Sequence, residues 1–222
     1  MKTAFRVILV IFAIFFATLA FRSIMRPEKF KMVYETRKTE IRNKLTFLRA
    51  AQAVYKNEMK VYASDIDSLV DFVENGMINI VKITGDLPEG MTEEQAFKNG
   101  LLKKEIIQVP VMDKIIETDP TVAEFKNKFQ FIPHTNGKKF KIQVGSISSS
   151  TYVIPVYRVD VALDDILDNM NESITPENTG KLKAFFDYLI YGDLENEQQY
   201  REQYKDMWLG SLIEANTSGS WE

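Results

Sequence analysis

The sequence predicts an α+β protein in which a long N-terminal helix packs on a small, mostly antiparallel sheet. Two observations lead to this prediction. An apolar run near the N-terminus is followed by an amphipathic helical pattern, and the remainder alternates short β-branched runs with short helical patterns and turn signals. With 222 residues, 45% of them hydrophobic and 27% charged, the chain suits a folded protein with one main domain.

The apolar run covers residues 7–21, and as a helix it would span only about 22 Å, less than the roughly 30 Å of a hydrocarbon core. Residues 3–25 would span about 34 Å, provided that the arginines near both ends extend toward the headgroups. We therefore expect a transmembrane signal anchor at residues 1–26 that contacts lipid through residues 4–25. The flanking basic residues are Lys2, Arg6, Arg22 and Arg26.

A cleavable signal peptide is the alternative interpretation of the same segment. Residues 7–19 would be its apolar core, and Thr18-Leu19-Ala20 would be a small-residue cleavage site. Cleavage after Ala20 would produce a soluble exported binding protein. The bulky residues around the cut, such as Phe16 and Phe21, favour retention of the segment as an anchor.

The orientation of the anchor follows from two opposing arguments. Four basic residues follow the apolar run within residues 22–31 and two precede it, so strict counting of positive charge places the large domain in the cytoplasm. A short N-terminal tail before one apolar segment is instead the layout of a signal anchor, whose domain is exported. We expect a single-pass protein of the inner membrane with its main domain in the periplasm.

Apolar residues recur at steps of three or four from Ile41 to Met59 and predict an amphipathic helix over residues 29–61. No glycine or further proline interrupts residues 28–62, so the anchor and this helix are expected to form one rod, bent near Pro27. The expected parts of the chain are the anchor at 1–26, an amphipathic stalk helix at 27–62 and an α+β extracytoplasmic domain at 63–222.

Short elements are expected in the first half of that domain. Ser64 is the expected cap of a helix that stops at Gly76 in a C′ position. Thr92 and Gln95 form a capping-box pattern. The expected elements are a helix at 65–75, a strand at 77–84, a helix at 92–99 and an extended segment at 106–116 that Pro110 confines to an edge or a bulge.

In the second half, the Asn-Gly pair at 136–137 predicts a hairpin between strands at 125–133 and 139–147. The remaining expectations are a strand at 152–161, a short helix at 163–170, a loop at 171–180, an apolar-aromatic segment at 181–191, a polar acidic stretch at 192–206 and a last short strand at 207–213.

The charges are distributed unevenly along the chain. Residues 1–60 hold 13 Lys and Arg against 4 Asp and Glu, whereas residues 160–222 hold 4 against 14, although the whole chain is only −3. We expect the basic residues of the stalk to form a solvated helix face near the membrane, with contact with the acidic C-terminal third, within one molecule or between copies, and with anionic lipid as alternatives. Nucleic acid is not an expected partner, because aromatic residues of the stalk are placed for packing.

The residue types exclude much catalytic chemistry. The chain has no cysteine and one histidine, His134, so disulfides, thiolate nucleophiles and cysteine-type metal sites are excluded. Nucleotide-binding glycine motifs are missing, and the serines at 146 and 148–150 have the pattern of strand-end or turn residues. We predict a protein that is not an enzyme, with no catalytic residue, no cofactor and no metal.

One acidic cluster has side chains of the kind that bind metal ions, because hard cations bind several carboxylate and carbonyl oxygens. Its spacing does not fit an EF-hand loop, so a solvated helix end is favoured over a cation site. An envelope enzyme that uses carboxylates alone is the remaining catalytic alternative. The cluster comprises Asp160, Asp164, Asp165, Asp168, Asn169 and Asn171.

The order of an apolar helix, an amphipathic helix, Ala51-Gln52-Ala53-Val54-Tyr55 and then a Tyr62-containing segment with a short helix resembles type IV pilin-like proteins, especially the pseudopilins of type II secretion. The resemblance covers residues 1–75 and implies a membrane-anchored, exported subunit of an envelope filament or secretion machine without catalysis of its own. The chain has no glycine before Gly76 and no acid before Glu28, so the prepilin cleavage motif is missing and an uncleaved anchor is expected.

These expectations combine into one hypothesis. The chain is expected to be a structural or scaffold subunit of a bacterial envelope assembly for secretion or motility. Its expected partners are the lipid bilayer, other envelope proteins and further copies of itself.

Overall fold

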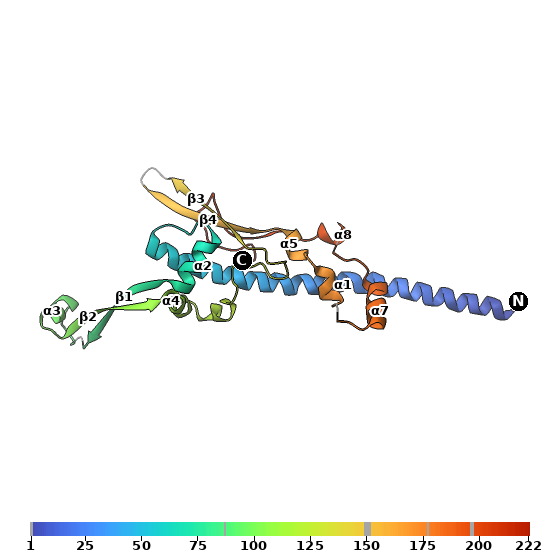
Figure 1. Ribbon diagram of the computed structural model, residues 1–222, viewed down its shortest axis with the longest axis horizontal. Helices are drawn as coiled ribbons and strands as arrows, with labels where there is room; N and C mark the ends of the chain where they lie inside the picture. Colours follow the sequence, from blue (N-terminus) through green and yellow to red (C-terminus); the bar gives the residue numbers. More distant parts are fainter. Residues whose placement is uncertain (1, 87, 149–151, 177, 196–197) are drawn as a thin grey trace.

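The computed structural model describes residues 2–222 except 87, 149–151, 177 and 196–197. The molecule is elongated, with helix α1 (Lys2–Met59) along its length, the N-terminus at one end and two β-hairpins at the other (Figure 1). Helices and the three-stranded antiparallel sheet pack along the second half of α1, and the two-stranded antiparallel sheet projects beyond its end. The expected α+β class is confirmed.

Helix α1 is the expected rod. It contains 58 residues and passes through Pro27 without a break in the helix. Its apolar first part includes a segment long and apolar enough to cross a membrane by length and composition, and none of that segment is buried. From Phe30 onward one face of α1 is buried under the rest of the chain.

A buried glutamine holds the turn that follows α1. Lys60 ends the helix in the left-handed region, with φ 65°. The side chain of Gln52 then exchanges two hydrogen bonds with Ala63, donating from Nε2 to its carbonyl at 3.1 Å and accepting from its amide at 2.9 Å. Because Gln52 is fully buried, this pair satisfies polar groups that would otherwise destabilise the core.

Helix α2 (Ile66–Asn75) differs from the expected helix at both of its ends. The cap is Asp65 rather than Ser64, because the Asp65 carboxylate accepts the Ser68 amide at 2.8 Å. Gly76 has φ −71° and is not left-handed. A glycine fits there because a Cβ would lie 2.2 Å from the carbonyl oxygen of Phe72.

The next elements form a projecting hairpin. Strands β1 (Met77–Gly85) and β2 (Leu102–Pro110) pair antiparallel along their full lengths, and α3 (Glu93–Lys98) lies between them with its expected capping box. Beyond Pro110 the expectation of an extended segment is wrong, because α4 (Val111–Thr118) begins there. Val111 and Ile115 are four residues apart and are both buried, which is helical periodicity.

The predicted hairpin of 125–133 with 139–147 is also wrong. A 3₁₀ helix, η1 (Pro120–Phe125), precedes a segment of turns, and one isolated bridge joins Phe131 to Lys139. Phe129 and Ile132 of that segment are both buried at a spacing of three, which turns can supply and a strand cannot. The three-stranded sheet instead has the order β3–β4–β5, from β3 (Lys141–Ser148), β4 (Val153–Val161) and β5 (Met207–Gly210).

Among the described residues between β4 and β5, four segments are short helices. The single helix expected at 163–170 is interrupted at Asp168 and Asn169, where Asn169 is left-handed with φ 54°. The expected loop at 171–180 therefore begins as a helix. These elements are α5 (Leu163–Leu167), α6 (Met170–Ile174), α7 (Lys181–Tyr191) and α8 (Gln198–Arg201).

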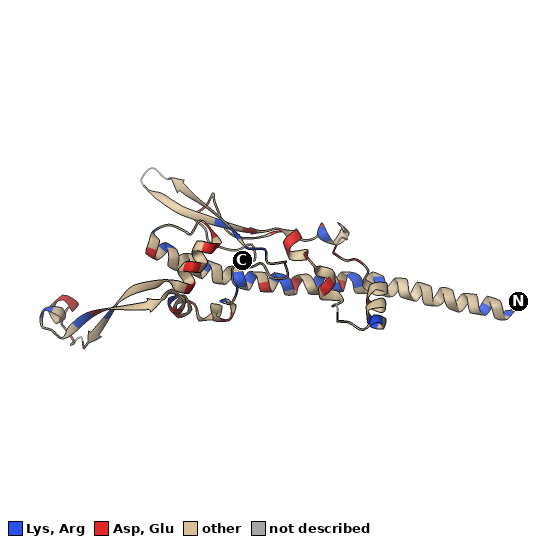
Figure 2. Ribbon diagram, in the orientation of Figure 1, with Lys and Arg blue, Asp and Glu red and all other residues tan. Residues whose placement is uncertain are grey.

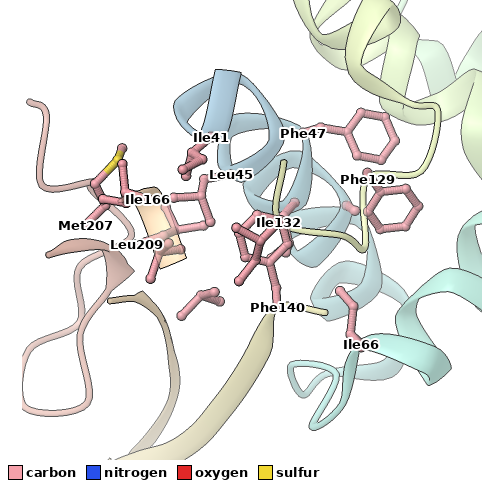
Figure 3. Packing of buried hydrophobic residues seen from close by; sticks show 14 of the residues in the cluster. Ile41, Leu45, Phe47, Ile66, Phe129, Ile132, Phe140, Ile166, Met207 and Leu209 are labelled. Atoms are coloured by element: carbon pink, nitrogen blue, oxygen red, sulfur yellow. The ribbon is translucent and has the colours of Figure 1, made fainter. Parts of the chain in front are cut away.

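The core lies against a broad face of α1 (Figure 3). Ile41 and Leu45 face Leu209 of β5, and elsewhere on the helix the ring of Phe47 lies 4.8 Å from that of Phe129. Burial of each such side chain contributes about 2 kcal/mol. The body is thus stabilised chiefly by what it packs onto α1.

We predict that Asp65→Ala destabilises the protein by about 1 kcal/mol at neutral pH through loss of the α2 cap. Hydrogen bonds from the amide and hydroxyl of Ser68 lower the pKa of Asp65 in the folded state. The cap therefore stabilises the fold above the unfolded pKa and is lost as pH falls through the folded pKa. Urea denaturation of the full chain in detergent at neutral and at acidic pH measures both effects.

Glu74→Ala, a change of an exposed acid at the other end of α2, is the matched control and should leave stability nearly unchanged. A difference between wild type and Asp65→Ala that persists unchanged at acidic pH would contradict a role for the ionised cap.

Candidate functional site

The acidic cluster of the C-terminal third lies around α5, and three of its carboxylates form separate ion pairs. The partners are Asp160 with Arg158, Asp164 with Arg201 and Asp165 with Lys138. Within the described part of the chain, no group of three or more His, Cys, Asp or Glu side chains is placed to hold a metal ion. In this arrangement the three carboxylates form surface ion pairs.

The asparagines of the cluster support the backbone. The side chain of Asn171 donates to Asp193 at 2.8 Å and accepts the amide of Leu194 at 3.1 Å. These bonds fasten α6 to the segment that follows α7. The sequence pattern placed Asn171 among possible ligands, whereas the structure uses it as a connector between two segments.

A buried arginine from α1 holds the break between α5 and α6. Arg37 is 2% exposed, and its guanidinium donates to the carbonyls of Ile166 at 3.0 Å, Asp168 at 2.5 Å and Asn169 at 2.9 Å. It also donates to the hydroxyl of Ser173 at 2.6 Å. The carbonyls of Ile166 and Asp168 lie at the C-terminal end of α5, where a cation is favourable. The carbonyl of Asn169, at the start of α6, also accepts the amide of Glu172 at 3.2 Å.

Burial lowers the pKa of Arg37, and the nearby carboxylates of Glu195 and Asp168 oppose that shift. The guanidinium thus remains in the core because carbonyl oxygens replace the water that it has lost. Sequence reasoning assigned Arg37 no role, since a single basic residue in an amphipathic helix is ordinarily solvated.

Other contacts join the basic stalk to the acidic third within the same chain, which is one of the alternatives that the charge distribution left open. Figure 2 shows where the charged residues lie along the backbone. The guanidinium of Arg49 pairs with the carboxylate of Glu222 at 2.5 Å and lowers its pKa. The ring of Tyr34 lies 4.1 Å from that of Tyr204, and burial raises the pKa of Tyr34 to about 12. The intramolecular form of that contact is therefore present.

We predict that Arg37→Leu lowers the free energy of unfolding by about 3 kcal/mol, because it leaves the carbonyls of Ile166 and Asp168 without the donor that they have in the core. Arg37→Lys, which keeps the charge with fewer donors, should lose less. The control is Arg42→Leu, at an exposed position of the same helix, and it should change stability by less than about 0.5 kcal/mol. Denaturation followed by tryptophan fluorescence measures all three, and equal losses for the two leucine variants would contradict this role.

His134 has a partner that local sequence could not reveal. Its Nε2 lies 2.6 Å from Oε2 of Glu40, which is 94 residues away on α1. His134 is itself left-handed, with φ 63°, at the start of the turn that the sequence predicted. The pair lies on the surface and ties this turn to the stalk.

The serines singled out by the sequence lie at the distal end or outside the described residues. Ser149 and Ser150 are among the latter. Ser146 lines an open hollow of about 410 Å³ between β3–β4 and the end of α1, together with Val61, Tyr62 and Val144. The described residues that line it include Lys60 but no acid or histidine, and the ammonium of Lys60 donates to the carbonyl of Asn57 at 2.6 Å.

The clearest candidate functional surface is the β1–β2 hairpin. It projects beyond the end of α1, away from the N-terminus (Figure 1). Val81 lies opposite Ile106, and both point to the face that Met77 and Ile83 also share. All four side chains are exposed, and Ile106 is 71% exposed. We call these four residues the hairpin face.

The hairpin also has backbone N–H and C=O groups at its outer edges that no other strand of the described residues pairs. Its sheet has two strands among the described residues, so each strand has an outer edge. An isolated two-stranded hairpin is marginally stable in water, and an apolar edge strand readily pairs with another chain. The sequence could have indicated this surface, because residues 77–84 carry apolar side chains on both strand faces, whereas a solvated hairpin would have one polar face.

The β3–β4 hairpin presents a second exposed apolar region at the same end. Val144 and Val153 are exposed, and the adjoining Tyr152 is exposed as well. Figure 1 shows this hairpin extending past the body in the same general direction as β1–β2. Both exposed apolar hairpins thus lie far from the bare part of α1.

Comparison of the chain with protein-family models, curated proteins and solved structures finds no match. The long apolar N-terminal helix on a small antiparallel sheet is loosely pilin-like in shape. The candidate functional features are therefore the bare apolar part of α1 and the exposed hairpins.

Proposed function

We propose that this protein is a non-enzymatic, single-pass membrane-anchored scaffold subunit of a bacterial envelope assembly. The apolar first part of α1 crosses the inner membrane, the second part carries the body into the periplasm, and the β1–β2 hairpin binds a protein partner. The pilin-like shape supports a role in secretion or motility machinery.

The observation that carries this proposal is the separation of two exposed apolar regions. The bare segment of α1 lies at one end of the molecule, and the hairpin face lies at the other. Each would be unfavourable in water, and each has the length and shape suited to a different environment. A helix with apolar residues on all sides suits a bilayer, and a flat apolar hairpin suits a protein.

The partner that fits the hairpin is a protein that adds a strand to its open edge. Such pairing satisfies the free backbone groups, and the hairpin face supplies apolar contact area. Charges near this face are mixed, since Lys104 lies opposite Ile83 and Lys82 lies opposite Glu105. Strand addition with apolar packing is therefore favoured over recognition through charge alone.

We predict that Ile106→Lys removes a specific partner from complexes isolated in mild detergent. Burial of an isoleucine contributes about 2 kcal/mol, so its replacement should reduce recovery of that partner by roughly tenfold or more. Quantitative mass spectrometry of complexes from cells that express wild-type or variant protein measures the recovery.

The matched control is Ile213→Lys, which changes an isoleucine that is 85% exposed and lies outside the hairpin face. It should leave the complex intact. Equal loss in both variants, recovery of wild type as a monomer alone, or recovery of further copies of this chain alone would each count against a distinct partner protein on the hairpin.

We also predict that the native protein retains residues 1–20 and stays in the membrane after alkaline carbonate extraction. The reason is that the segment around Ala20 is a continuous part of α1 with bulky neighbours. Intact-mass measurement of the protein purified from its own membrane tests this. A mass that lacks residues 1–20, with protein in the soluble fraction, would favour the cleaved exported binding protein instead.

A further inference from the structure

Helix α7 turns its apolar side outward. Leu182, Phe185, Phe186 and Leu189 have the spacing i, i+3, i+4 and i+7, which places them on one side of the helix. All four are exposed, with Leu182 at 73% and Phe185 at 60%, and no residue of α7 is buried. We call these four residues the α7 face. A helix that packed against its own protein body would bury this face.

The position of α7 beside α1 indicates which surroundings could cover the α7 face. Its C-terminal end lies against α1 just after the apolar run, where Arg26 donates from Nε to the carbonyl of Tyr191 at 2.8 Å. The ammonium of Lys29 lies 5.9 Å from the centre of the Tyr191 ring. A Cβ built on the next residue, Gly192, would lie 3.5 Å from guanidinium nitrogens of both Arg22 and Arg26.

Figure 1 shows α7 lying across the direction of α1, at the point where the bare part of α1 meets the body. A helix that crosses a membrane-spanning helix at the level of its flanking arginines lies in the plane of the headgroups. The two helices thus have the relative arrangement of a spanning helix and a surface helix.

We propose that α7 is an interfacial helix, which buries the α7 face at the boundary between headgroups and acyl chains of the same bilayer that α1 crosses. This inference rests on the proposed function, because it requires α1 to span that bilayer. It adds a second membrane contact that the sequence did not indicate, since residues 181–191 were recognised only as an apolar-aromatic segment.

The charges around α7 favour phospholipid over a protein surface as the occupant. Six basic residues and three acidic ones lie on α7 and on the adjoining turns of α1 and the chain, and one of the acids, Asp187, is paired with Lys183 at 2.9 Å. Basic residues beside an apolar helix face attract anionic headgroups. The basic residues are Arg22, Arg26, Lys29, Lys31, Lys181 and Lys183, and the acids are Glu28, Asp187 and Asp193.

The absence of cysteine from the sequence allows a direct test with single labels on the full chain. Phe186→Cys places an environment-sensitive fluorophore on the α7 face, and Ile14→Cys places it in the middle of the apolar run. The matched control is Ile106→Cys, because Ile106 is equally apolar and exposed but lies at the far end of the molecule. Each protein is inserted in bilayer nanodiscs of phosphatidylcholine and phosphatidylglycerol that contain nitroxide-labelled lipid.

We predict that the label at 186 is quenched by lipid with a nitroxide near the headgroup and has blue-shifted emission. The label at 14 should be quenched best by a nitroxide deep in the acyl chains, and the label at 106 should be quenched by neither. A second label at Leu182→Cys should behave like that at 186, which guards against a local effect of one substitution.

The outcomes separate the two proposals. If the label at 14 is quenched while those at 182 and 186 are not, α1 spans the bilayer and the interfacial role of α7 is wrong. Blue-shifted but unquenched labels on α7 would show that protein, either another subunit or a second copy, covers the face and would also overturn the inference. If the label at 14 is not quenched, the membrane anchor itself is wrong and the α7 proposal fails with it.

Discussion

Burial of one face of α1 is the constraint on which the rest of the structure depends. The two sheets are small and separate, with two and three strands, and neither could enclose a core alone. From Phe30 to Val54 the buried face of α1 supplies the surface against which the other elements pack. Even polar contacts follow this plan, because Gln52 and Arg37 on α1 satisfy backbone groups of segments that arrive from elsewhere in the chain.

The buried face of the second half of α1 is therefore unavailable for outside partners. The hairpin face lies at the distal end of the molecule, the bare segment of α1 lies at the other end, and α7 lies where that segment meets the body. In the acidic third, Asp164 and Asp165 form ion pairs with Arg201 and Lys138, and the carbonyl of Asp168 accepts a hydrogen bond from Arg37 of the stalk. The exposed apolar regions are therefore the best candidates for binding, and the packed body along α1 connects them.

Sequence patterns predicted the elements that depend on local chemistry. The long helix, the capping box at Thr92 and the strand at 77–84 follow from periodicity and capping alone. Some failures are local, such as the cap at Asp65 and the helix after Pro110, and others involve contacts between distant residues. Residues 125–133 fold as turns because Phe129 and Ile132 pack on α1, and β3 pairs with β4 instead. Two features of the candidate site could not be predicted from neighbouring residues in the sequence. They are the pairing of Glu40 with His134 and the exposure of the apolar side of α7, because both depend on how distant segments pack.

Because α1 is one unbroken helix, it sets fixed distances along the molecule. From Arg26 to Met59 the helix rises about 50 Å at 1.5 Å per residue, so its length sets how far the body extends along the axis. The same helix fixes direction as well as distance, because each residue turns the chain by about 100°. A partner for the distal hairpin must therefore approach at a set height and from a set side, and a change in helix length would alter both together.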